Sequence, residues 1–255
     1  KIPSRILNFN GCYTIPWRCY YAKDLENVML AGRDISTTRL GLASTRIIGC
    51  CAIGGEAVGI AAALCNKYAC NPRELAPHVK ELQQLILKED GFLPGFKNED
   101  EKDLALKAKI TASSWEQGGE PEKVANGISR KLGEEQNGWV TKPGECLIMK
   151  WNETKEIREI RLTFESNFAY PIRVTMAPLR QAQQRNGVPE ELVKDVKIEL
   201  YREGKKTGEA FVKDNYQRLC SVGIGDVPAD EIRVIPESTN GAEQAVIHEI
   251  RVYAK

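Results

Sequence analysis

The segment from residue 26 to 64 limits the possible folds most, because it joins a short apolar run to a long stretch of very small residues. Residues 28–31 predict a strand that leads directly into Gly32-Arg33. After a polar loop, a helix is predicted to begin near Arg46 and to run through alanines and glycines to residue 64. Side chains this small allow close packing against another backbone, so we expect a buried helix with little exposed surface.

The same helix is long enough to raise the question of a membrane span. Residues 47–65 are nearly uncharged, and a span needs about 20 apolar residues. However, Glu56 lies in the middle, glycines interrupt the segment, and no basic flank marks an orientation. We therefore predict a core helix and no membrane span.

Composition argues against two further classes of function. The chain has 36 Lys and Arg residues against 35 Asp and Glu residues, so its charge gives no reason to expect a nucleic acid partner. The eight cysteines include the adjacent Cys50-Cys51, and also Cys65 and Cys70, which flank a predicted helix end. None of them has the spacing of a metal site, so we predict no bound metal and interpret the cysteines as free thiols.

The chain is predicted to divide near residue 100. Residues 71–90 predict an amphipathic helix, with Asn71-Pro72 at its start and Gly91 after its end. The acidic run 98–103 is interpreted as a solvated loop at a domain boundary. Beyond it, short runs alternate apolar and polar residues, as half-buried antiparallel strands do. The predicted strands are 110–113, 146–151, 159–164, 172–176, 196–201, 209–212, 217–222, 231–235 and 247–253.

These patterns predict a chain of the α+β class with two domains. Residues 1–97 would form part of an α/β domain, built from the strand, the buried helix and the amphipathic helix. Residues 106–255 would form an antiparallel β-sandwich, because many short strands follow one another without intervening helices.

The first part resembles the C-terminal, flavin-contacting segment of a family of FAD-dependent oxidoreductases. The resemblance rests on residues 13–19, on Gly32-Arg33 after the apolar run, and on Ser44-Thr45-Arg46 before the small-residue helix. It implies that the Gly-Arg turn touches the ribityl side of FAD and that the helix directs its positive N-terminus at the flavin ring. The cofactor-binding residues implied are Gly32, Arg33, Ser44, Thr45, Arg46 and Ile47.

Arg46 is the candidate for a catalytic role, because the resemblance places an arginine where it can bind an anionic substrate group or stabilise charge on the ring. The alternative is an arginine that braces the loop through an ion pair. Relatives often carry histidines in the preceding loop, and here Arg39 and Leu42 hold those places. The two histidines of the chain, His78 and His248, are interpreted as residues without a catalytic role.

The sequence lacks the Gly-x-Gly-x-x-Gly turn that binds the ADP half of FAD in such enzymes. It also starts without an initiator methionine, so we expect the C-terminal portion of a longer enzyme. The partner would then be the N-terminal FAD-binding region, and the full-length parent, not this chain alone, would retain FAD. The resemblance implies a periplasmic or secreted bacterial protein.

The second part resembles the discoidin-like, galactose-binding-type jelly roll. The resemblance rests on residues 108–115, 121–127, 137–140, 157–162 and 249–253. Such domains bind ligands in loops at one end of the barrel, with aromatic rings against the apolar faces of sugars. The resemblance thus implies a polysaccharide ligand, and the candidate loop residues are Trp115, Glu116, Gln117, Asn167, Phe168, Tyr170 and Tyr216.

Three functions remain open from the sequence. The first is an enzyme portion in which FAD carries the hydride chemistry, with a carbohydrate-binding-like module appended. The second is a non-catalytic carbohydrate-binding or docking module carried on a flavoprotein scaffold. The third is a structural spacer without a ligand.

Overall fold

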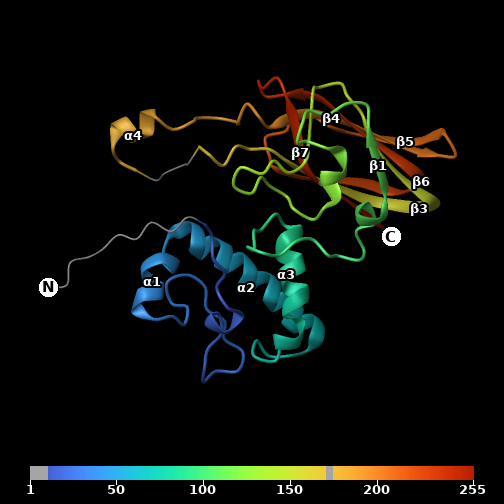
Figure 1. Ribbon diagram of the computed structural model, residues 1–255. Coiled ribbons are helices and arrows are strands. Elements are labelled where there is room, and N and C mark those ends of the chain that lie inside the picture. The colour runs from blue at the N-terminus through green and yellow to red at the C-terminus, as the bar shows by residue number, and fades with distance from the viewer. Residues whose placement is uncertain (1–10, 171–174) are drawn as a thin grey trace. The chain divides into compact units, whose positions relative to one another are not determined.

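Two compact units make up the chain, residues 1–97 and residues 98–255. The computed structural model describes residues 11–170 and 175–255 (Figure 1). Helices dominate the first unit and antiparallel strands the second, so the chain has the predicted α+β class.

Residues 11–97 of the first unit contain three α-helices. After a 3-10 helix (Trp17–Cys19), α1 (Arg39–Thr45) and α2 (Ile48–Tyr68) follow one another with a break at Arg46 and Ile47. Thr38 caps α1, because its hydroxyl accepts a hydrogen bond from the Gly41 N–H at 3.2 Å. A second 3-10 helix (Ala76–His78) leads into α3 (Val79–Lys88).

Two elements of the first unit are shorter than predicted. Residues 28–31 form no strand, because Met29 makes an isolated bridge with Tyr21 and its neighbours add no further ladder pairs. The amphipathic helix begins at Val79, because residues 72–75 form turns instead. In these turns the Asn71 N–H donates to the Glu74 carboxylate at 2.8 Å, so the predicted capping pair closes a turn and not a helix.

The small-residue helix α2 is buried along one stripe only. Its buried residues, spaced along one face, are Gly54, Ala61, Leu64 and Cys65, and this face packs in the cluster that includes α3. Ile48, by contrast, is 75% exposed. The prediction of a helix with little exposed surface is therefore wrong, since its neighbours in the unit cover only one side. Among the described residues, α2 is the one helix long and apolar enough to cross a membrane, judged by length and composition alone.

Gly54 and Gly55 are expected to respond oppositely to substitution. A Cβ at Gly54 would lie 2.9 Å from Tyr20 Cε1, whereas a Cβ at Gly55 would meet no atom within 4 Å. We expect Gly54→Val to lower the free energy of unfolding by about 1–3 kcal/mol through overpacking. Gly55→Ala should raise it by up to about 1 kcal/mol, because alanine favours the helix. Urea denaturation measures both, and equal effects would contradict the packing of Tyr20 on α2.

Among the described residues of the second unit, seven antiparallel strands form one sheet in the order β2-β7-β3-β6-β4-β5, with β1 paired to β3. Figure 1 shows α4 (Pro178–Ala182) on a long excursion between β3 and β4. The strands are β1 (Lys109–Ala112), β2 (Trp139–Thr141), β3 (Leu147–Phe164), β4 (Val193–Arg202), β5 (Lys205–Val212), β6 (Leu219–Thr239) and β7 (Ala245–Ala254).

Two long strands, β3 and β6, make the sheet into the predicted sandwich. They pair with each other on both sides of a register shift between Lys150 and Lys155. The first part of β3 also pairs with β1 and its last part with β7, so the strand contributes to both layers. The core includes Trp139, Leu147, Met149, Ile160, Leu162, Phe164, Ile198, Leu200, Ile232 and Ile250.

The sequence predicted two short strands in place of each long one: 146–151 and 159–164 in place of β3, and 217–222 and 231–235 in place of β6. Where a break was predicted, the chain stays extended as it passes from one layer to the other. The predicted strand 172–176 falls mostly outside the described residues.

The acidic run 98–103 differs from the predicted solvated loop. Asn98 and Asp103 are buried and joined by a hydrogen bond of 2.8 Å. The Asp103 carboxylate also accepts from the N–H groups of Ala105 and Val252, at 3.0 and 2.9 Å. This run therefore anchors the start of the second unit to β7.

Candidate functional site

An open pocket of about 440 Å³ in the first unit is lined by Arg33, Asp34, Leu42 and Arg46. Gly32 has φ +107°, a conformation that favours glycine, and turns the chain just before Arg33. Arg46 lies in the break between α1 and α2, and its N–H donates to Leu42 O at 3.3 Å. The fold thus brings two arginines from separate turns to one pocket.

Of the six residues predicted for the cofactor, only Arg33 and Arg46 line this pocket. Thr45 is buried, and its hydroxyl donates to Gly41 O at 3.1 Å, so it stabilises α1. Ser44 Oγ lies 2.5 Å from Tyr13 Oη, which ties the segment to the chain before it. Ile47 is exposed at the N-cap of α2. Asp34 and Leu42 complete the pocket, although neither was predicted as a site residue.

The charges around the pocket favour an anionic ligand. Arg33 and Arg46 supply two positive charges against the one negative charge of Asp34. α2 begins at Ile48 without a side-chain cap, so the unpaired N–H groups of its first turn add partial positive charge close to Arg46. Leu42 provides an apolar surface in the same space.

A comparison with known protein families matches this part of the chain. Residues 4–86 match the model of the family described as FAD dependent oxidoreductase. The FAD-oxidoreductase match includes Gly32 and all four pocket residues, and it confirms the resemblance predicted from the sequence. No curated protein gives a significant match to the chain.

Solved structures similar to the chain include carbohydrate-binding modules. A fucose binding module from Streptococcus pneumoniae is 12% identical, with 62% of this chain and 99% of that chain covered and a TM-score of 0.45. The family 32 module of C. perfringens NanJ, solved with galactose, is 16% identical, with 60% and 98% covered and a TM-score of 0.43. A chitosan-binding module from Paenibacillus, solved with chitotriose, is 15% identical, with 60% and 100% covered and a TM-score of 0.43.

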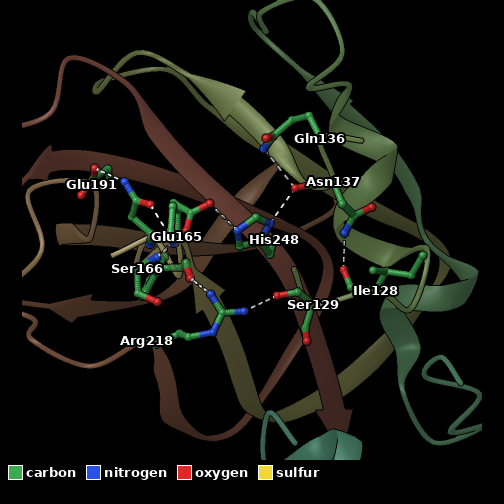
Figure 2. A network of polar contacts seen from close by, with 12 residues as sticks. Ile128, Ser129, Gln136, Asn137, Glu165, Ser166, Glu191, Arg218 and His248 are labelled. Carbon is green, nitrogen blue, oxygen red and sulfur yellow. Dashed lines mark hydrogen bonds and ion pairs between the residues drawn. The ribbon is translucent and has the colours of Figure 1, made fainter. Parts of the chain in front are cut away.

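In the second unit, a polar network centred on His248 joins several loops (Figure 2). His248 is 1% exposed, and its Nδ1 lies 2.6 Å from Asn137 O while its Nε2 lies 3.1 Å from Glu165 Oε2. Each ring nitrogen therefore lies within hydrogen-bonding distance of an oxygen acceptor, a carbonyl on one side and a carboxylate on the other.

A β-bulge directs His248 into the network. Thr163 pairs with Glu249 and Phe164 pairs with Ile247, so His248 is the extra residue on β7. This role of His248 was not predicted, although the sequence holds a signal for it. The two polar residues between Ile247 and Ile250 break the alternation of the strand, and such a break is typical of a bulge.

The pKa of Glu165 is lowered to about 2, against an ordinary value of 4.5. Burial by itself would raise this pKa, but the hydrogen bond and charge of His248, the Asn167 N–H and the Arg218 charge together outweigh it. Glu165 Oε1 accepts from the N–H groups of Ser166 and Asn167, at 2.8 and 2.5 Å. The ionised carboxylate therefore fixes the start of the loop that follows β3.

This loop, residues 165–170, presents two exposed aromatic rings, Phe168 and Tyr170. The guanidinium of Arg218 lies 4.7 Å from the Phe168 ring, and that of Arg185 lies 3.7 Å from the Tyr170 ring. Arg218 also donates to Phe164 O and Ser129 O, and Arg185 pairs with Glu191 at 2.6 Å. We call residues 165–170 the aromatic loop.

The other predicted ligand residues lie on two further turns. Trp115 is 51% exposed on a turn in which the Glu116 N–H donates to Val140 O at 2.9 Å, and Gln117 is the next residue. Tyr216 is 71% exposed on a turn just before Arg218. Asn167 has a bracing role, because its amide donates to Glu191 Oε1 at 2.6 Å. Among the described residues, no group of three metal-ligating side chains comes together.

Proposed function

We propose that residues 4–86 form the ring-facing part of a flavin site and that the chain is the C-terminal portion of an FAD-dependent oxidoreductase. In this proposal residues 98–255 are an appended carbohydrate-binding-like module. The observation that carries the first half is the pocket, in which Arg33 and Arg46 converge within the segment that matches the family.

The pocket residues fit the ring end of FAD. A space of about 440 Å³ lies within the usual range for small-molecule sites, and Leu42 offers an apolar contact for one face of a planar ring. When bound, FAD supplies the hydride chemistry. Arg46 would stabilise negative charge at the ring or bind an anionic substrate group, and Arg33 would position the cofactor. The ADP half needs a phosphate-binding turn that the 255 residues lack.

A flavin titration of the 255-residue chain tests this proposal. We expect weak binding without a stoichiometric flavin absorbance band after purification, because half a site forgoes the pyrophosphate contacts. Arg46→Ala should weaken the residual binding about tenfold, which corresponds to roughly 1.4 kcal/mol. Arg39→Ala is the matched control, since Arg39 is exposed nearby but does not line the pocket. Equal affinity in both variants, or a stoichiometric flavin band, would contradict the proposal.

A second candidate function, a glycan-binding or docking module, is favoured by the aromatic loop. Phe168 and Tyr170 are 61% and 50% exposed, yet Arg218 and Arg185 hold guanidinium groups against them. Exposed rings suit the apolar faces of sugars, and adjacent arginines suit hydroxyl or carboxylate groups. The proposed ligand is a plant or microbial polysaccharide, bound weakly because the surface is open.

Calorimetric titration of the full chain with neutral and uronic acid-containing oligosaccharides tests this second function. Phe168→Ala should reduce affinity about tenfold, and Trp115→Ala reports whether the neighbouring turn contributes. Phe211→Ala is the matched control, because Phe211 is also exposed and lies under a lysine, but on β5. If neither class of oligosaccharide binds, the second function is wrong and residues 98–255 are a structural unit.

A further inference from the structure

The C-terminus of α2 brings two cysteines together. Ala69 has φ +48°, a left-handed conformation that turns the chain back onto the last turn of the helix. The Cys70 N–H donates to Cys65 O at 3.0 Å, and the Ala69 N–H donates to Asn66 O at 3.3 Å. These two bonds define a Schellman motif, in which the side chains at the positions of Cys65 and Cys70 contact each other.

The contact in this motif is made by two thiols. Burial raises the pKa of the Cys65 thiol, and the neighbouring Cys70 side chain raises it further. Cys65 is buried, whereas Cys70 is half-buried. Both pack in the apolar cluster that contains Leu64 and Leu75, so their positions are fixed by the core of the unit. Cys70 is therefore the accessible member of a preformed pair.

We propose that Cys65 and Cys70 are a site of reversible disulfide formation that staples the end of α2 to the following turn. The co-reactant is a low-molecular-weight disulfide of the glutathione class. The Cys70 thiolate attacks one sulfur of this disulfide, the S–S bond breaks, and one carrier thiolate leaves and takes up a proton. The Cys65 thiolate then attacks the Cys70 sulfur and releases the second carrier thiol. Two protein thiols are oxidised and one disulfide is reduced to two thiols.

The pair differs from the other cysteines of the first unit in its geometry. Cys50 and Cys51 are neighbours in a regular helix, and Cys51 directs its thiol to Thr45 O at 3.5 Å. Cys12 is exposed. Among the described cysteines, Cys65 and Cys70 are joined by a backbone hydrogen bond that places their side chains next to each other.

The disulfide can be detected directly by peptide mapping, because trypsin cleaves after Lys67, which lies between the two cysteines. We would incubate the native 255-residue chain with oxidised glutathione, block free thiols by alkylation, digest with trypsin and analyse the peptides by mass spectrometry. Peptides 47–67 and 68–73 should appear linked, with fragmentation placing the bond at Cys65. The oxidised chain should also melt several degrees higher than the reduced chain, because the bond restricts the unfolded state.

Two comparisons decide the result. Cys70→Ser should abolish the linked peptides, whereas Cys12→Ser should leave them unchanged. In the native chain, modification of the exposed Cys12 shows that the oxidant is active. Glutathione trapped on Cys70 without resolution by Cys65 would overturn the proposal. A link from Cys70 to Cys50 or Cys51 would overturn it as well, and so would an unreacted Cys70 beside a modified Cys12.

Discussion

Replacing His248 with alanine is expected to lower the free energy of unfolding of the second unit by about 3 kcal/mol, because the change leaves the partly buried carboxylate of Glu165 without its hydrogen-bonding partner. Asn137 O also loses its donor. Urea denaturation followed by tryptophan fluorescence measures the loss. The control is His78→Ala, since His78 lies in the first unit and stacks on the Tyr68 ring with the ring centroids 3.7 Å apart. A loss below about 1 kcal/mol for His248→Ala would contradict the role assigned to the network.

The same pair predicts how stability depends on pH. The folded pKa of Glu165, about 2, lies below its ordinary value of 4.5, so its contribution is complete above pH 4.5 and is lost as the pH falls toward 2. The difference corresponds to about 3 kcal/mol. In His248→Ala this acid-dependent loss should shrink, because the hydrogen bond and charge that lower the pKa are gone. Equal acid dependence in the two proteins would show that another group lowers the pKa of Glu165.

Gly138→Ala is expected to destabilise the second unit by about 3 kcal/mol, since strain and overpacking act together. Gly138 has φ +101°, and a Cβ there would lie 2.5 Å from Ile247 O and 2.7 Å from His248 Cα. Both contacts are with backbone atoms, so no side chain can move aside. β2 would have to separate from β7, and Asn137 would move away from His248.

Gly133→Ala is the matched control for this substitution. Gly133 lies in the same loop with φ +59°, and a Cβ there would meet no atom within 4 Å. It should therefore cost only the conformational strain, about 1–2 kcal/mol. Thermal and urea unfolding of both variants make the comparison. Equal losses would contradict the close approach of residue 138 to β7.

Local patterns predicted most strands of the second unit, because a period of two residues directly reports which side chains face a core, but the short strand β2 was not among them. They did not predict that residues 147–164 form a single strand, because the passage from one layer to the other depends on β1 and β7, which pair with different parts of β3. The exposed side of α2 was missed for a similar reason. Small residues allow close packing on every side, but the first unit provides neighbours on one side only.

The candidate sites were predictable to different degrees. Arg33 and Arg46 followed from the family resemblance, and the fold places both at one pocket. The helix boundary near Arg46 was predicted, but α1, which carries Leu42 to the pocket, forms where the sequence predicted a polar loop. His248 was interpreted as having no special role because a lone histidine on a strand is usually structural. Its importance depends on Asn137 and Glu165, which are distant in sequence.

The central claim is that the pocket of Arg33 and Arg46 faces the flavin ring of FAD. The most direct measurement is the change in backbone amide chemical shifts of the isotope-labelled 255-residue chain as FAD is added, since weak binding suffices for this method. We predict that the changes concentrate at residues 32–34 and 42–49 and disappear in Arg46→Ala. Changes confined to residues 98–255, or an unchanged pattern at residues 32–49 at saturating FAD, would contradict the account.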